Sequence, residues 1–301
     1  MQQFLQNNIV QDYLRTPAAI LSSLVLVAII FCAIFAGYIT NQNPFDPMQL
    51  DLMDSQIPPV WLEYGDERFI FGTDEQGRDV LAALFYGSRL SLLVGLASVL
   101  LSCFIGIGLG LAAGFFRGTT DTIVTRLADL QMTIPGLIVA LMLAGVIKSQ
   151  ISMEMQETVM IYVVILAIGF SDWPKYARVT RSAVMIESQE DYVLAARAMG
   201  ASPWYILFKH VLPNVMRSNI VIATVGLGIA IMLEATLSFL GAGVPVSTPS
   251  LGTLIRTGSN FLFAGEWWVV FFPGLMLILT VFSINILGDW LRDAMNPKLD
   301  T

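Results

Sequence analysis

Long apolar runs separated by short polar stretches dominate this chain. A helix that crosses a bilayer needs about 20 consecutive apolar residues, and six segments approach that requirement. They are residues 18–39, 90–115, 123–147, 158–172, 218–240 and 267–291. The pattern therefore predicts an all-α polytopic membrane protein with about six transmembrane helices.

The third and fourth segments are the least regular of the six. The third begins with the charged residues Arg126 and Asp129, and the fourth is short. The first segment carries no charge and is too long for the apolar region of a secretory signal peptide. We therefore expect it to be an uncleaved first helix.

Composition agrees with this pattern and excludes a soluble protein with a large core. Of the 301 residues, 55% are hydrophobic and 13% are charged, whereas a soluble domain carries about 25% charged residues. Basic residues then set the orientation, because they gather in cytoplasmic loops. The segment between the fourth and fifth spans contains Lys175, Arg178, Arg181, Arg197, Lys209 and Arg217. This distribution predicts that residues 173–217 and both termini are cytoplasmic.

The loop after the first span is acidic and rich in proline. Before the second helix it holds nine acidic residues against two arginines, Arg68 and Arg78. Its prolines are Pro44, Pro47, Pro58 and Pro59. Because proline interrupts helices, we expect an irregular but folded extracytoplasmic loop.

These predictions divide the chain into four parts. Residues 1–39 form the cytoplasmic N-terminus and the first span, and residues 40–86 form the extracytoplasmic loop. Residues 87–291 form a core of five spans that includes the cytoplasmic segment 173–217. Residues 292–301 form a cytoplasmic tail.

Small residues form a stripe on one face of the second span. They recur every four residues at Ser98, Ser102, Gly106, Gly110 and Gly114. Such spacing allows two helices in lipid to approach closely. The stripe is either a packing surface or a surface on which helices slide, and the two interpretations are compatible.

The cytoplasmic segment has the local pattern of a helix, a turn and a second helix. Ser188 and Asp191 are spaced as a capping box for the first helix. Tyr192, Ala196 and Met199 recur at helical spacing and predict an apolar face.

The turn and the second helix have their own signals. Gly200 suits the left-handed residue that ends a helix. Ser202 and Pro203 suit an N-cap followed by proline in the first turn, and Pro213 is expected to end the second helix. Such a hairpin is either a lever held by a protein partner or an amphipathic hairpin that lies on the lipid headgroups.

The same segment resembles a known family motif. The spacing of Ala195-Ala196, Gly200 and Leu212-Pro213 is similar to the EAA motif of ABC importer permeases. Leu194 occupies the position where the motif has an acidic residue, a departure that is common in the peptide branch of the family.

The resemblance covers roughly residues 15–298. Further stretches resemble the second, shorter permease of dipeptide, oligopeptide and nickel importers. They are residues 71–74, 77–79, 86–92, 126–129, 234–241 and 285–293.

The resemblance implies a MetI-like type I ABC importer permease fold in the bacterial inner membrane, with both termini cytoplasmic. It implies a permease subunit that forms half of a pore for peptides, or alternatively for nickel or another small solute. The implied partners are a second permease, two ATP-binding subunits and an extracytoplasmic solute-binding protein. The implied ATPase-coupling residues are Ala195, Ala196, Arg197, Gly200, Ala201, Ser202, Pro203, Trp204, Leu212 and Pro213.

No catalytic residues are expected. None of Lys148, Lys175, Lys209 and Lys298 follows a glycine, so the sequence lacks a Walker A motif. ATP and Mg²⁺ are therefore expected in partner subunits, with no cofactor on this chain. His210 is the only histidine and has no arrangement of cysteines or carboxylates that suggests a metal site.

A secondary transporter or channel is the alternative from another class. It predicts two related halves with charged or broken helices at the midplane, and the sequence shows no internal repeat. An intramembrane enzyme would need a nucleophile–base pair or a set of metal ligands, and neither is apparent.

A few charged residues are candidates for the pore or a gate. Glu234 lies within the fifth span, where an ionisable group either lines the pathway or pairs with a neighbouring helix. Arg126 and Asp129 are three residues apart and are expected to pair on one helix face. Asp289 and Arg292 repeat that spacing at the end of the sixth span.

Overall fold

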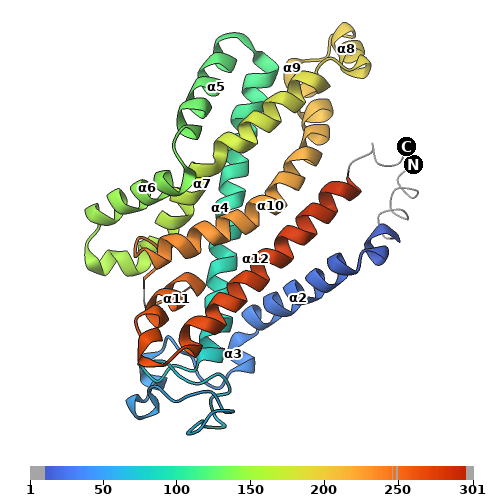
Figure 1. The fold of residues 1–301 in the computed structure, drawn as a ribbon. Coiled ribbons are helices and arrows are strands. Elements are labelled where there is room, and N and C mark those ends of the chain that lie inside the picture. The colour runs from blue at the N-terminus through green and yellow to red at the C-terminus, as the bar shows by residue number, and fades with distance from the viewer. Residues whose placement is uncertain (1–10, 246, 249, 296–301) are drawn as a thin grey trace.

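The computed structural model describes residues 11–245, 247–248 and 250–295, and is helical throughout its membrane part (Figure 1). Five helices are long and apolar enough to span a bilayer. They are α2 (Pro17–Ile34), α4 (Val80–Phe116), α7 (Met153–Glu187), the continuous helix that ends with α10 (Leu212–Phe239), and α12 (Trp268–Ala294). No β-strand occurs in these residues beyond an isolated bridge. The predicted fold class is confirmed.

The third expected span is two helices rather than one. α5 (Gly118–Met132) and α6 (Gly136–Gln150) are bent by 89° relative to one another. The span predicted over residues 123–147 is therefore interrupted, a break that the sequence pattern did not predict. The reason is Pro135, which lacks a backbone N–H and disfavours helical geometry at the preceding residue. Counted as one broken span, the pair brings the total to six.

Several helices extend beyond the apolar runs that predicted them. α4 begins at Val80 instead of residue 90, because the side chain of Asp79 caps it by accepting a hydrogen bond from the Leu81 N–H at 3.0 Å. α7 continues to Glu187, so residues 173–187 of the expected cytoplasmic segment 173–217 extend the fourth span as one helix. A span predicted from hydropathy ends at the first charged residues. The helix itself continues until its backbone hydrogen bonding is interrupted.

α4 and α7 pack against one another along most of their length. A Cβ atom added to Gly106 would lie 2.5 Å from the Trp173 carbonyl oxygen, and one added to Gly110 would lie 2.6 Å from that of Ala177. The small-residue stripe therefore serves close helix packing, as one of its two interpretations required. The two helices form the centre of the bundle.

The remaining helices surround this pair. α2 packs on α12 and α4, and its other apolar side chains are exposed, as with Leu21 at 65% and Leu24 at 63%. Such a face is suited to lipid. α5 and α6 lie on the opposite side of α4 and α7 from α2 (Figure 1).

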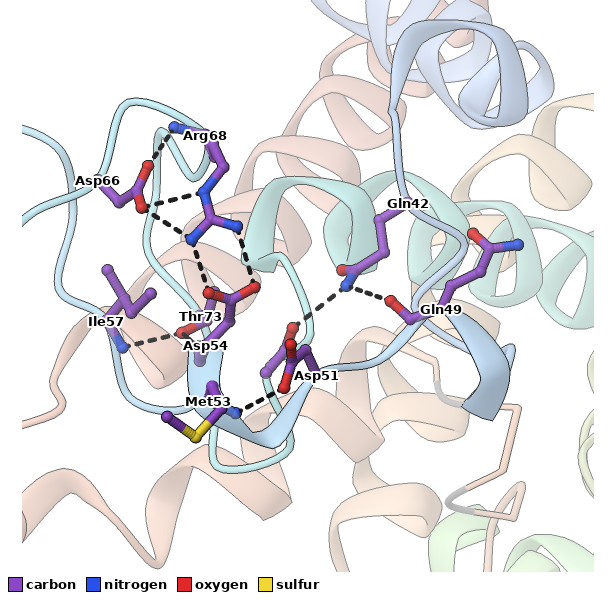
Figure 2. A network of polar contacts seen from close by, with 10 residues as sticks. Gln42, Gln49, Asp51, Met53, Asp54, Ile57, Asp66, Arg68 and Thr73 are labelled. Atoms are coloured by element: carbon purple, nitrogen blue, oxygen red, sulfur yellow. Dashed lines mark hydrogen bonds and ion pairs between the residues drawn. The ribbon is translucent and has the colours of Figure 1, made fainter.

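One end of the bundle is covered by an irregular cap, defined here as residues 40–79. It contains only the short 3₁₀ turns Pro47–Gln49 and Leu52–Asp54. Figure 2 shows its polar network: Arg68 pairs with Asp54 at 2.6 Å, and the Thr73 hydroxyl donates to the Asp54 carbonyl oxygen at 2.6 Å. Side chains thus form hydrogen bonds with backbone polar groups of the cap that are not paired in a helix or a sheet.

The cap is joined to the last span. The Trp268 indole N–H donates to the Thr73 carbonyl oxygen at 3.0 Å, and the Phe71 ring stacks on Phe272 with centroids 4.2 Å apart. A short helix, α11 (Leu251–Ser259), was not expected from the sequence and packs on α12 at this end.

Candidate functional site

At the opposite end from the cap, α8 (Asp191–Ala198) and α9 (Pro203–Ile206) form the expected helical hairpin (Figure 1). Gly200 has a φ of +82°, and its N–H donates to the Arg197 carbonyl oxygen at 3.1 Å. The Ala201 N–H donates to the Ala196 carbonyl oxygen, also at 3.1 Å. These two bonds define a Schellman motif, and the prediction for Gly200 is confirmed.

The start of α9 also follows the prediction. The Ser202 hydroxyl accepts a hydrogen bond from the Tyr205 N–H at 3.3 Å, and Pro203 occupies the first turn. Pro213 does not end this helix, however. The π-helical turn Leu207–Val211 joins α9 directly to α10. Because a π turn shifts the hydrogen-bond register, the chain passes a proline without a break.

Two details of the first helix differ from the prediction. Ser188 ends α7 instead of capping α8, and its buried hydroxyl has no hydrogen-bond partner among the described residues. The buried face of α8 is formed by Val193 and Ala196, whereas Tyr192 and Met199 are exposed. The spacing was correct, but it does not reveal which of two adjacent helical faces meets the bundle.

The hairpin is anchored on three helices through buried side chains. Val193, Ile206 and Val211 pack in one cluster with Leu111 of α4, Val184 of α7 and Val215 of α10. The exposed side also carries large apolar side chains, because Met199 is 82% exposed and three aromatic rings of the hairpin are exposed as well. These rings are Trp204, Tyr205 and Phe208, with exposures of 59%, 54% and 56%.

The other residues predicted for coupling fall into three groups. Ala195, Arg197, Gly200, Ser202, Pro203 and Pro213 are exposed, Ala196 is buried, and Ala201 and Leu212 are half-buried. Apart from Pro213, which lies at the start of α10, the exposed group spans the end of α8, the turn and the start of α9. It is the part of the hairpin that a partner protein can touch.

A polar contact that the sequence did not suggest ties the hairpin to two spans. The Asn214 side-chain amide donates to Glu187 at 2.7 Å and to the Tyr192 hydroxyl at 2.8 Å. Tyr192 also donates to Glu187, and partial burial followed by this bond raises the pKa of Tyr192 to about 12. An Asn one residue after a proline is an ordinary feature, so no sequence signal pointed to it.

Glu234 is fully buried between three helices. It accepts hydrogen bonds from the hydroxyls of Ser91 on α4 at 2.8 Å and Ser238 on α10 at 2.7 Å. Ser91 in turn accepts from the Leu251 N–H of α11 at 3.2 Å. This arrangement supports a role in pairing helices; whether Glu234 also contacts the pathway stays a prediction.

The expected pair of Arg126 and Asp129 does not form. Asp129 pairs with Arg178 of α7 at 2.6 Å instead, because the two residues lie on facing helices. Among the described residues, Asp289 and Arg292 also make no ion pair with one another. Within the same part of the chain, no group of three His, Cys, Asp or Glu side chains is placed to hold a metal ion.

Comparison with known proteins identifies the family. Residues 106–301 match the family described as "Binding-protein-dependent transport system inner membrane component", and residues 7–59 match "N-terminal TM domain of oligopeptide transport permease C". The chain belongs to the binding-protein-dependent transport permeases. It is thus a multi-pass membrane protein and a transport subunit, not an enzyme.

Named relatives cover nearly the whole permease. It is 40% identical to the di/tripeptide transport system permease protein DppC of Pseudomonas aeruginosa, over 96% of this chain and 91% of that protein. It is also 34% identical to the oligopeptide transport system permease protein OppC of Bacillus subtilis, over 93% of this chain and 86% of that protein. The predicted family is confirmed.

A solved structure supports the fold. The permease matches a chain of the inward-facing MetNI methionine ABC transporter with a TM-score of 0.54, covering 71% of this chain and 96% of that chain. At 22% sequence identity this likeness shows the fold alone. It agrees with the predicted MetI-like type I importer permease fold.

Proposed function

We propose that this permease forms half of the translocation pore of an ATP-driven peptide importer, and that the hairpin of residues 191–211 binds an ATPase subunit. The names of relatives that align with more than nine tenths of the chain support peptides as the substrate class. Nickel and other small solutes are the alternative substrates.

The observation that carries the coupling role is the two-sided packing of the hairpin. Its inner side is fixed to the bundle by Val193, Ile206 and Val211, while Met199 and Trp204 project from its outer side. Exposed aromatic and methionine side chains are enriched at protein interfaces. Because packed interiors transmit displacement, a partner that moved this hairpin would move α7 and α10 with it.

The proposed orientation follows the basic residues. The hairpin and both termini face the cytoplasm of a bacterial cell, and the cap faces outward. The proposed partners are a second permease, two ATP-binding subunits that hold ATP and Mg²⁺, and an extracytoplasmic solute-binding protein. This chain supplies the pathway and the docking segment, and its partners supply the energy and the selection of solute.

Substitution of Gly200 tests the docking role. A β-branched residue at a φ of +82° costs about 1–2 kcal/mol, so Gly200→Val should distort the turn. Purified from membranes that contain every subunit, Gly200→Val should recover about five- to thirtyfold less ATPase. Recovery of the second permease should be unchanged.

Gly200→Asn is the matched control, because asparagine tolerates the left-handed conformation and no atom lies within 4 Å of an added Cβ. It should recover a normal amount of ATPase. Equal recovery for all three proteins would remove the turn from the interface. A chain recovered alone that conducted solute without ATP would overturn the importer itself.

The substrate is tested on the solute-binding protein that is proposed as a partner. Calorimetric titration with peptides of two to six residues, nickel chelates and sugars should give binding for peptides only. Binding of nickel chelates without peptides would establish the alternative substrate.

A further inference from the structure

Two interruptions lie side by side within the bundle. Pro174 interrupts the hydrogen bonding of α7, and the break at residues 133–135 separates α5 from α6. Because proline has no N–H, the Phe170 carbonyl oxygen four residues earlier loses its helical donor. Phe170 lies within a membrane span, where no water replaces the missing donor, so its carbonyl needs another partner in the protein.

The side chain of Gln131 supplies that partner. Its amide nitrogen donates to the Phe170 carbonyl oxygen at 2.6 Å and to that of Ser171 at 3.1 Å. Its amide oxygen accepts a hydrogen bond from the Trp173 indole N–H at 2.9 Å. Both ends of the amide are therefore used, and the contacts fix its orientation.

Two charged side chains, those of Asp172 and Lys175, lie next to Pro174. Asp172 is buried and pairs with Lys175 at 2.7 Å, across Pro174. A Cβ added to Gly136, the first residue of α6, would lie 3.7 Å from the Asp172 carboxyl oxygen. A carboxylate at a helix N-terminus is favoured by the helix dipole. Asp172 of α7 therefore also stabilises the position of the α6 N-terminus against α7.

Pro174 divides α7 into two halves, and the break at residues 133–135 separates α5 from α6. Each half of α7 contacts one of these two helices. α5 is joined to the second half of α7 by Asp129–Arg178 and Asp121–Arg181. α6 packs on the first half of α7 in one buried cluster, which contains Ala140, Ala144, Val163, Val164 and Ala167. Only the second half of α7 leads directly into the hairpin at residues 191–211.

We propose that Gln131 is a positioning residue that keeps the break between α5 and α6 in register with the proline of α7. Through the contacts of Gln131, displacement of the hairpin is transmitted to α6, past the interruption of α7 at Pro174 and the break between α5 and α6. This role rests on the proposed function, because it requires a partner that moves the hairpin.

The test uses the complete complex reconstituted in lipid vesicles with its solute-binding protein. Gln131→Met removes every contact of the amide at similar volume. Trp173→Phe removes the bond to the amide oxygen and leaves the two carbonyl contacts of Gln131 in place. Gln150→Met is the matched control, because Gln150 is exposed at the end of α6. The measured quantity is peptide imported per ATP hydrolysed.

With Gln131→Met, peptide imported per ATP should fall about three- to thirtyfold, with a smaller fall for Trp173→Phe and none for Gln150→Met. The amount of assembled complex should change less than twofold. A purely structural role would lower assembly and leave the ratio constant, and that result would overturn the proposal.

The two proposals fail in different ways. If the unaltered complex imports peptide and Gln131→Met imports as much per ATP, only the role of Gln131 is wrong. If the unaltered complex hydrolyses no ATP or imports nothing in response to it, the proposed function is wrong and the role of Gln131 falls with it.

Discussion

Glu234 is accommodated in the bundle by neutral hydrogen-bond donors. Two serine hydroxyls donate to its carboxyl group, and the described residues include no basic partner within ion-pair distance of it. The sequence identified Glu234 because an ionisable group in a span is costly to bury. It did not identify Ser91, which lies 143 residues away, since serine is common in helices and carries no distinguishing signal.

Glu266 at the junction of the cap and α12 predicts a pH-dependent stability. It is 7% exposed, and burial followed by the neighbouring Glu75 and Asp74 raises its pKa. Asp74 itself pairs with Arg78. An acid whose pKa is raised by folding contributes stability at low pH and loses it as pH rises through the folded-state value.

Glu266→Gln should therefore raise the melting temperature at pH 7.5 by about 2 °C and have no effect near pH 4. Thermal unfolding of the detergent-solubilised protein at both pH values measures this. Glu67→Gln makes the same charge change at an exposed position of the cap and should have no effect at either pH. A gain for Glu266→Gln that was equal at both pH values would contradict the explanation.

At the scale of single helices, the glycines of α4 divide into two kinds. A Cβ on Gly106 would lie 2.5 Å from both the Trp173 carbonyl oxygen and the Tyr176 Cβ. A Cβ on Gly108 would meet nothing within 4 Å. Gly106 is therefore needed for the contact with α7, whereas Gly108 is not.

Gly106→Ala should destabilise the protein by about 1–3 kcal/mol, because overpacking forces α4 and α7 apart. Gly108→Ala should be neutral or slightly stabilising, because alanine favours helix by about 1 kcal/mol over glycine. Unfolding of both variants followed by tryptophan fluorescence in detergent gives the comparison. Equal losses would show that the close approach is unimportant.

Element boundaries show what the sequence reveals and what it does not. The local signals at Gly200 and Ser202 were reliable, because each acts on hydrogen bonds within a few residues. Those at Ser188 and Pro213 were not, because the neighbouring helices α7 and α10 continue through these positions. The break at Pro135 was not predicted because a hydropathy pattern counts apolar side chains and carries no information about a change in the direction of the helix axis. The extent of α7 was missed because the partner that compensates for Pro174 is Gln131, on another helix.

At the scale of the whole molecule, the cap is held to the bundle by few polar contacts. The bond from the Trp268 indole to the Thr73 carbonyl is one of them, and Trp268 is 6% exposed. Its neighbour Trp267 is 38% exposed. The two tryptophans therefore offer a matched pair for testing how the cap is attached.

Trp268→Phe should leave the Thr73 carbonyl without its indole donor and weaken attachment of the cap by about 1 kcal/mol. Amide hydrogen exchange in residues 57–79 should become about fivefold faster, while exchange in α4 and α7 stays the same. Trp267→Phe should leave both regions unchanged. Unaltered exchange in the cap of Trp268→Phe would show that the stacking of Phe71 on Phe272 suffices.

The contact between Thr73 and Trp268 also bears on how the protein is made. It joins residues 195 positions apart, and a chain is synthesised from its N-terminus. Four spanning elements lie between the cap and α12 in the sequence. They must be synthesised before the contact between Thr73 and Trp268 can form. Closure of the cap is a late event in biogenesis, and a closed cap marks a chain whose last helix has entered the membrane.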